Sequence, residues 1–224
     1  MKTVVFDLDG TLADTSEDLI AAANACFVGL GHEPMLDPVA DQLTAFHGGR
    51  AMLRLGFSRL AGNQDETDVD REYPKLLAHY GEHIDVHTTL YPGAEAAVRR
   101  LIEAGYRTAV CTNKPEFLAE TLLQRLGVRD LFGSLIGADT LPVRKPEPAP
   151  YLAAVEQAGG DVRQSYLLGD TVTDVRTARS VGVPIALVSF GPEGHEIKRL
   201  SPDHVLENFD HLIDMTTEIL GPGR

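Results

Sequence analysis

Two aspartates flank a single leucine near the start of the chain, in the stretch VVFDLDG that spans residues 4–10. Asp7 and Asp9 repel each other at this spacing, and Gly10 brings no positive charge to offset the repulsion. Two carboxylates this close can bind a hard cation, or can divide the roles of acid and base in one reaction. They can also belong to an ordinary solvated turn, so the other polar residues must decide between these interpretations.

Polar residues also follow two other apolar runs of the chain. Thr112 comes directly after residues 107–111, and Asp170 comes directly after residues 166–169. Because the carboxyl ends of parallel strands meet at one edge of an open α/β sheet, where such folds bind their ligands, we expect Asp7, Thr112 and Asp170 to lie together. The sequence therefore predicts a ligand site at that edge.

A cluster of carboxylates at this edge predicts a metal site. Its members are Asp7, Asp9, Asp170 and Asp174. Mg²⁺ would stabilise them, because it takes oxygen ligands and commonly uses one or two carboxylates plus a phosphate. A calcium-binding EF-hand loop does not fit, because glycine stands at the fourth position from Asp7 rather than the sixth and no Glu stands at the twelfth. Lys145, in the loop RKPEP, supplies a positive charge to set against the acids.

Short apolar runs alternate with helical patterns over much of the chain, which is typical of an α/β fold. Buried strands are expected at residues 3–6, 107–111, 134–136, 166–168 and 185–188. Three helical patterns end at Gly105, Gly127 and Gly182, where glycine is typical of a helix C-terminal cap. We expect a doubly wound, Rossmann-like parallel sheet with helices on both faces.

One long interval breaks this alternation and contains only helical patterns. The sequence therefore predicts an α/β core domain of residues 1–14 and 88–224, with a helical domain of residues 15–87 inserted after the first strand. No internal repeat and no low-complexity tract interrupts either part.

Several helices are expected within the inserted domain. Residues 15–18, Thr-Ser-Glu-Asp, resemble a capping box, and Asp37-Pro38 is typical of an N-cap followed by proline in the first helical position. Two further helices are expected over residues 50–60 and 73–80. His83 and His87, beyond the last of these helices, are expected to be solvated residues of a hinge.

The composition limits the classes of partner. The 224 residues, 43% hydrophobic and 24% charged, are typical of a soluble protein with one large domain or a core and a smaller companion. A net charge of -13 repels nucleic acids and anionic lipids, so neither is expected as a partner. No apolar run is long enough for a membrane span or resembles a signal peptide, which predicts a cytoplasmic protein. Cys26 and Cys111 have no paired spacing and suggest neither a disulfide framework nor a zinc site.

Four motifs in this order carry a resemblance to a known family. They are DLDGTLADT at residues 7–15, TNKP at residues 112–115, Lys145-Pro146, and GDTVTD at residues 169–174. The series resembles the haloacid dehalogenase superfamily, in its branch of phosphoglycolate phosphatases and related small-molecule phosphatases. Tyr91-Pro92-Gly93 is similar to the same branch. The resemblance covers nearly the whole chain and implies that the inserted helical domain is a cap domain.

The resemblance implies a role for each residue of the core motifs. Asp7 would attack the phosphorus and form an aspartyl-phosphate, and Asp9 would protonate the leaving alkoxide and then activate water. Thr112, Lys145 and backbone N–H groups beginning at Leu8 would hold the phosphoryl oxygens. Asn113 and Lys114 would support them.

The resemblance also implies the metal and its ligands. Mg²⁺ would bind Asp7, the Asp9 carbonyl and Asp170, while Asp174 would orient a metal-bound water or Lys145. This arrangement explains the opening pair of acids, because a metal ion and a lysine would offset their repulsion.

The substrate is expected to be a small phosphate ester, with phosphoglycolate the leading candidate by resemblance. Sugar phosphates, including an amino-sugar phosphate, remain alternatives. Phe46-His47-Gly48-Gly49-Arg50 stands where related enzymes place a substrate-reading loop, so His47 and Arg50 are candidate substrate-binding residues. Arg50 could bind a carboxylate through two hydrogen bonds or could be a surface residue. The oligomeric state does not follow from the sequence.

Three other interpretations fit less well. A dehalogenase would share the nucleophile but leave Asp9 without a role, because that reaction has no alkoxide to protonate. A sugar-phosphate mutase would need a hinge histidine, which residues 17–20 lack. A non-enzymatic phospho-receiver domain is about half this length, lacks the insertion and is phosphorylated on a central strand. Sustained release of phosphate would separate an enzyme from a receiver.

Overall fold

The computed structural model describes residues 1–61 and 66–223, which divide into two compact units. The first unit joins Met1–Ala13 to Leu90–Arg224, and the second is Asp14–Thr89. The domains expected from the sequence have boundaries that differ from these by one residue at the first crossing and two at the second. No helix in the described ranges is both long and apolar enough to cross a membrane.

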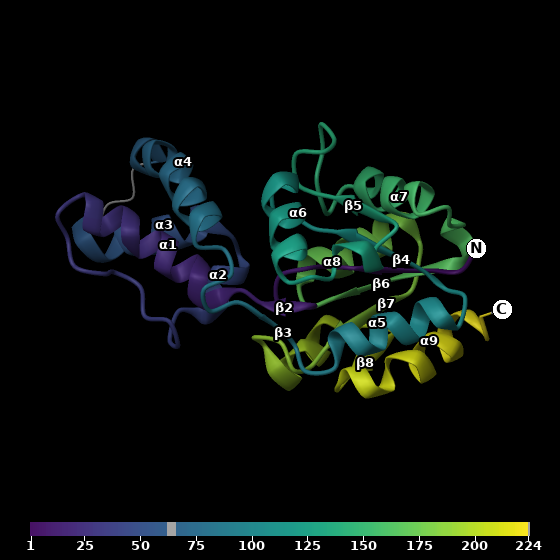
Figure 1. The fold of residues 1–224 in the computed structure, drawn as a ribbon. Helices are drawn as coiled ribbons and strands as arrows, with labels where there is room; N and C mark the ends of the chain where they lie inside the picture. Colours follow the sequence, from purple (N-terminus) through teal and green to yellow (C-terminus); the bar gives the residue numbers. More distant parts are fainter. Residues whose placement is uncertain (62–65, 224) are drawn as a thin grey trace. The chain divides into compact units, whose positions relative to one another are not determined.

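A six-stranded parallel sheet forms the centre of the first unit and confirms the predicted fold class (Figure 1). The strands, in spatial order, are β5 (Ser134–Ile136), β4 (Arg107–Cys111), β1 (Thr3–Phe6), β6 (Ser165–Gly169), β7 (Ile185–Val188) and β8 (His204–Leu206). The strand order reverses at β1, which pairs with β4 on one side and β6 on the other.

The register of these pairs decides which residues leave the sheet together. Phe6, the last residue of β1, lies opposite Val110 on β4 and Leu168 on β6. The residues that follow on all three strands therefore emerge at one carboxyl edge, at the switch point where open α/β sheets bind ligands. This is the edge at which the sequence predicts the site.

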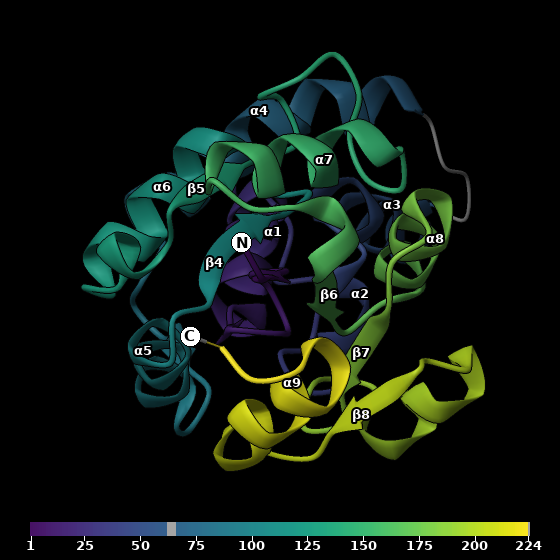
Figure 2. The same ribbon diagram turned by 90° about the vertical axis from the view of Figure 1, so that its right-hand side faces the viewer.

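Helices cover both faces of the sheet. α5 (Ala94–Glu103) and α9 (Leu212–Leu220) pack on one face, α7 (Pro148–Gln157) and α8 (Val172–Val181) on the other, and α6 (Glu116–Arg125) beside β5 (Figure 2). Every residue of β1, β6 and β7 is buried as a result, which explains why their sequences are continuous apolar runs rather than alternating ones. Among the described residues of this unit there are also four 3₁₀ helices: η1 (Arg129–Leu131), η2 (Val162–Gln164), η3 (Gly194–Leu200) and η4 (Phe209–His211).

The second unit is helical in its described residues, as the sequence predicts. Its helices are α1 (Ser16–Gly29), α2 (Gln42–Phe46), α3 (Gly49–Ala61) and α4 (Glu66–Glu82). Phe27 of α1 meets Phe57 of α3 edge to face, with ring centroids 5.1 Å apart. The short strands β2 (Ala13–Asp14) and β3 (Thr89–Leu90) pair where the chain passes from one unit to the other and back.

Of the two predicted helix starts in this unit, one is confirmed and one is wrong. Helix α1 begins as expected, but Thr15 makes no side-chain capping bond, and the Asp18 carboxylate instead accepts hydrogen bonds from the backbone N–H groups of His87 and Thr88. No helix begins at Pro38. The Asp37 carboxylate accepts hydrogen bonds from the N–H groups of Val39 and Ala40 and closes a turn. Helix α2 therefore starts only at Gln42.

Candidate active site

The turn after β1 presents Asp7 at the switch point. The Asp7 N–H donates to the Leu168 carbonyl at 2.9 Å, which extends the pairing with β6 by one residue and fixes the aspartate's backbone. The Leu8 N–H donates to Asp7 Oδ1 at 2.7 Å. Gly10 has φ 77°, in the left-handed region that favours glycine, and its N–H closes the turn on the Ala13 carbonyl. The glycine of the opening motif is therefore a backbone requirement.

The loop from β6 to α8 brings Asp170 and Asp174 to the same edge. Asp174 Oδ2 accepts from the Thr171 hydroxyl at 2.7 Å, from the Thr171 N–H at 3.1 Å and from the Asp170 N–H at 3.3 Å. A Cβ on Gly169 would lie 2.4 Å from Asp174 Cγ, so only glycine permits this close approach. The buried Asp174 carboxylate thus organises the loop that carries Asp170.

A buried lysine joins two of these carboxylates. Lys145 Nζ lies 2.9 Å from Asp7 Oδ2 and 2.7 Å from Asp174 Oδ1. Burial alone would favour the neutral amine, but Asp174 and Asp7 outweigh it and raise the pKa of Lys145, which therefore remains a cation. The Asn113 side chain donates to the Lys145 carbonyl at 3.0 Å and so helps to fix the loop that carries the lysine.

Asp7, Asp170 and Asp174 form a compact acidic group, with one carboxylate oxygen of each within 4.8 Å of the others. Burial raises the pKa of Asp7 to about 6, with Asp174 adding to the rise and Lys145 opposing it. Burial, with repulsion from Asp7 and Asp174, also raises the pKa of Asp170 well above its ordinary value. Ionisation of these carboxylates is therefore unfavourable in the protein alone. A bound cation would offset the repulsion between them and favour their ionised forms.

The hydrogen bonds of Asp170 show that the group fits a metal ion. Asp170 Oδ1 accepts from the Thr11 hydroxyl at 2.9 Å, whereas its buried Oδ2 has no hydrogen-bond partner among the described residues. A buried carboxylate oxygen without a donor is costly, and an oxygen-seeking ion such as Mg²⁺ would satisfy it. Both oxygens of Asp174 are already engaged, which suits it to holding Lys145 rather than the metal directly.

Asp9 has a lysine of its own. Lys114 Nζ lies 2.6 Å from Asp9 Oδ1, and the backbone N–H of Lys114 donates to the Thr112 hydroxyl at 3.1 Å. Both Lys114 and Thr112 are buried. The sequence predicts Lys114 only as a supporting residue and does not pair it with Asp9. Its position three residues after the end of a predicted strand, at the edge that carries the acids, is the signal that could have revealed the pair.

His47 and Arg50 lie in the second unit. His47 is exposed directly after α2. Arg50, in the first turn of α3, forms an ion pair with Asp70 at 2.6 Å and lies over the Tyr73 ring at 4.7 Å from its centroid. The guanidinium therefore already contacts two residues of α4, and the sequence does not predict these contacts.

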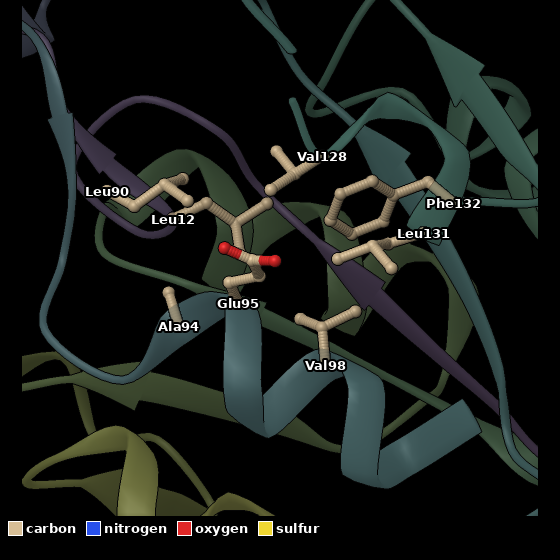
Figure 3. Close-up of a pocket in the computed structure, with 8 residues that line it drawn as sticks. All are labelled: Leu12, Leu90, Ala94, Glu95, Val98, Val128, Leu131 and Phe132. Carbon is tan, nitrogen blue, oxygen red and sulfur yellow. The ribbon is translucent and has the colours of Figure 1, made fainter. Parts of the chain in front are cut away.

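A separate hollow in the first unit is unsuited to a phosphate ester. It is lined by Leu12, Leu90, Ala94, Glu95, Val98, Val128, Leu131 and Phe132 (Figure 3). This lining is apolar apart from one carboxylate and includes no cation. The acidic group with its buried lysine is the better candidate for the chemistry.

An open parallel sheet with a lysine-bridged acidic group at its switch point defines an α/β enzyme of the kind that binds charged ligands at a strand edge. The family model for haloacid dehalogenase-like hydrolases matches residues 1–182. The chain belongs to this family.

Proteins of known sequence and structure extend the match to nearly the whole chain. Phosphoglycolate phosphatase of Agrobacterium fabrum is 36% identical over 92% of this chain and 88% of its own length. The enzyme of the same name from Mesorhizobium japonicum is 34% identical over 93% and 92%. The crystal structure of a predicted phosphoglycolate phosphatase from Haemophilus somnus superposes with a TM-score of 0.84 at 25% identity, covering 96% of this chain and 98% of the other. These matches confirm the resemblance to the phosphoglycolate phosphatase branch.

Proposed function

We propose that this hydrolase removes the phosphate group from phosphoglycolate in a Mg²⁺-dependent reaction that passes through an aspartyl-phosphate at Asp7. The family and its relatives make the protein a phosphatase of phosphoric monoesters. The observation that carries the mechanism is the placement of Asp7, held by Lys145 at the switch point beside an Asp170 oxygen that lacks a donor.

The first step uses Asp7 and Asp9 together. A carboxylate oxygen of Asp7 forms a bond to phosphorus while the bond from phosphorus to the ester oxygen breaks, and Asp9 donates its proton to the departing alkoxide. In the second step water attacks the same phosphorus, Asp9 takes the water's proton, and the bond to Asp7 breaks to release phosphate. Two aspartates are needed because one must remain a nucleophile while the other exchanges a proton.

The remaining groups hold the phosphoryl oxygens. Lys145 brings a buried positive charge to Asp7, and Thr112 offers a hydroxyl at the end of β4. Mg²⁺, held by Asp7, the Asp9 carbonyl and Asp170, would supply further positive charge to the transferring group. Lys114, paired with Asp9, positions the carboxylate that exchanges protons.

Phosphoglycolate is favoured because relatives that match more than 90% of this chain carry that activity in their names. The part of the substrate that differs between phosphate esters must be read outside the phosphoryl site, and the second unit, as a cap domain, would read it. Arg50 is the candidate contact for the glycolate carboxylate, because its planar guanidinium can donate two parallel hydrogen bonds. His47 is the second candidate, since it is exposed at the turn before α3.

The test is a panel of phosphate esters assayed with the purified protein and Mg²⁺. We expect kcat/KM to be highest for phosphoglycolate, by about tenfold or more over sugar and amino-sugar phosphates. A higher value for a sugar phosphate would overturn the substrate but not the phosphatase mechanism. A single stoichiometric phosphorylation without sustained phosphate release would overturn both and indicate a receiver.

A further inference from the structure

Three side chains with metal-binding atoms meet at the C-terminal end of α4, outside the catalytic site. His79, Glu82 and His83 are spaced at i, i+3 and i+4, so that they share one face of the helix. One ligand atom from each lies within 4.8 Å of the others, and all three residues are exposed. We propose that they bind a divalent transition-metal ion of the Zn²⁺ class.

The ligand set distinguishes this ion from Mg²⁺. Two imidazole nitrogens and one carboxylate oxygen suit Zn²⁺, Cu²⁺ and Ni²⁺, whereas Mg²⁺ prefers oxygen alone. The solvent that reaches these exposed side chains can supply a fourth ligand and complete a tetrahedral shell. The two metals would therefore occupy different places in the protein, Mg²⁺ among the aspartates of the first unit and the transition metal on α4.

A hydrogen bond favours the tautomer of His83 that metal binding needs. His83 Nδ1 lies 3.1 Å from the carbonyl oxygen of His79, so a proton on Nδ1 is donated there. The lone pair then lies on Nε2, which is left to bind the metal. A ligating histidine in proteins almost always donates its other ring N–H to a carbonyl or carboxylate in this way.

The positions of the two imidazole rings and the C-terminus of α4 also favour a bound cation. The His79 and His83 rings are stacked with centroids 5.9 Å apart and planes 25° from parallel, so the two imidazoles already lie together. The carbonyl end of a helix carries partial negative charge, which favours a cation beside Glu82. The net charge of -13 favours cation binding in the same direction.

A bound ion would restrain the point at which the chain leaves α4. His83 is the first residue after the helix, and a metal joining it to His79 and Glu82 would oppose fraying of the last turn. The segment that follows is already held at its far end, where Asp18 accepts from the N–H groups of His87 and Thr88 at 3.0 and 2.9 Å. The ion would thus fix the near end of the segment that returns the chain to β3.

The spacing His-x-x-Glu-His is itself the sequence signal for this site. The two cysteines do not point to it, and the prediction that His83 is a solvated hinge residue gives that histidine no ligand role. The structure brings the three side chains together because α4 continues to Glu82 and the His83 N–H still donates to the His79 carbonyl at 3.2 Å, so that the helical spacing extends to His83.

Calorimetric titration of the full chain with Zn²⁺, under saturating Mg²⁺ and in a buffer without phosphate, tests the proposal. Saturating Mg²⁺ occupies the aspartate site, so that the heat reports sites selective for Zn²⁺. We expect one Zn²⁺ per chain, with affinity reduced about tenfold or more in His79→Ala or His83→Ala and lost in the double variant. His32→Ala, which removes an exposed histidine elsewhere in the same unit, should leave the affinity unchanged.

Two further readouts separate ligation from a structural role of the histidines. Co²⁺ in place of Zn²⁺ should produce visible absorption bands in the wild type that the double variant lacks, and affinities should rise from Mn²⁺ through Co²⁺ and Ni²⁺ to Cu²⁺. Because the side chains are exposed, circular dichroism of the variants should match the wild type. Absence of saturable Zn²⁺ binding, or equal binding by the double variant and the wild type, would overturn the proposal, whatever the protein's activity on phosphate esters.

Discussion

At the scale of single residues, each acid of the opening pair has its own lysine. Lys145 lies 2.9 Å from Asp7, and Lys114 lies 2.6 Å from Asp9. Both lysines are buried, so each ion pair lies where the effective dielectric constant is lower and charge interactions are stronger than in water. The repulsion between the two acids is thus offset twice, once for the proposed nucleophile and once for the proposed proton carrier.

The division of roles predicts different consequences for two kinds of ester. Asp9→Asn removes the proposed proton donor but keeps the size of the side chain. Hydrolysis of phosphoglycolate, whose alkoxide must be protonated, should fall by about a hundredfold or more, the ordinary contribution of an acid catalyst. Hydrolysis of p-nitrophenyl phosphate, whose leaving group needs little protonation, should fall much less when kcat/KM is compared for both esters. Equal losses on the two esters would contradict the assigned role.

The raised pKa of Asp7 predicts how Mg²⁺ and pH act together on stability. In the metal-free protein this pKa is about 6, above the 3.8 of an ordinary aspartate, so the folded state holds the proton more tightly. The stabilisation from that proton is complete below about pH 4 and is lost as pH rises through about 6. The proposed Mg²⁺ would bind the ionised carboxylate, so its stabilising effect should grow over the same interval.

Urea unfolding with and without Mg²⁺ checks this prediction. The increase in the unfolding midpoint on adding Mg²⁺ should be clearly larger at about pH 7.5 than at about pH 5. Increases of the same size at both pH values would show that the carboxylates of the acidic group do not take part in metal binding.

At the scale of helices and strands, close packing of α1 against α3 depends on one glycine. A Cβ on Gly56 would lie 2.2 Å from the Phe27 ring. Gly56→Ala should therefore lower the free energy of unfolding by about 1–3 kcal/mol, the usual effect of overpacking. Gly29→Ala, at the end of α1, is the matched control because a Cβ there meets no atom within 4 Å. The free energies of unfolding of both variants can be measured by chemical denaturation. Equal values for the two variants would contradict the packing argument.

Buried strands were the elements most readily predicted from the sequence. β1, β4, β5 and β7 match the expected residues, because strands covered on both faces have continuous apolar sequences. β8 was missed, since it has three residues and only Leu206 is buried. The helices α7 and α9 were also not predicted.

Side-chain partners were harder to predict than positions. The residue types and their spacing place Asp7, Thr112 and Asp170 at one edge, because strand ends follow from local pattern. Which lysine meets which acid, and that Asp18 binds a distant backbone rather than capping its own helix, depend on contacts between residues far apart in the chain. Local sequence patterns do not predict such long-range contacts.

At the scale of the whole molecule, a chain with net charge -13 must attract a substrate that is itself an anion. The attraction has to be local, from Lys145, a metal ion and a cation that reaches the substrate's other end. The proposed cap domain offers Arg50 for that purpose, at present paired with Asp70. Substrate binding would then require Arg50 to exchange one carboxylate partner for another.

Arg50→Ala tests whether the inserted domain reads the substrate. For phosphoglycolate the variant should lose about 1.5–3 kcal/mol of transition-state binding, the range for a hydrogen bond to a charged group. For p-nitrophenyl phosphate, which has no carboxylate, kcat/KM should change little. Asp70→Ala, which keeps the arginine and removes its partner, should retain the preference for phosphoglycolate. Equal losses by Arg50→Ala on both esters would place Arg50 in cap closure or phosphoryl binding instead.

The central claim is that Asp7 forms the bond to phosphorus, and Asp7→Asn tests it most directly. p-Nitrophenyl phosphate is the right ester, because its leaving group makes little demand on Asp9 and so isolates the nucleophile. With saturating Mg²⁺, and with folding verified by circular dichroism, kcat/KM of the variant should fall by about a thousandfold or more, because the amide is a poor nucleophile. A variant that retains activity within about tenfold of the wild type would contradict the claim.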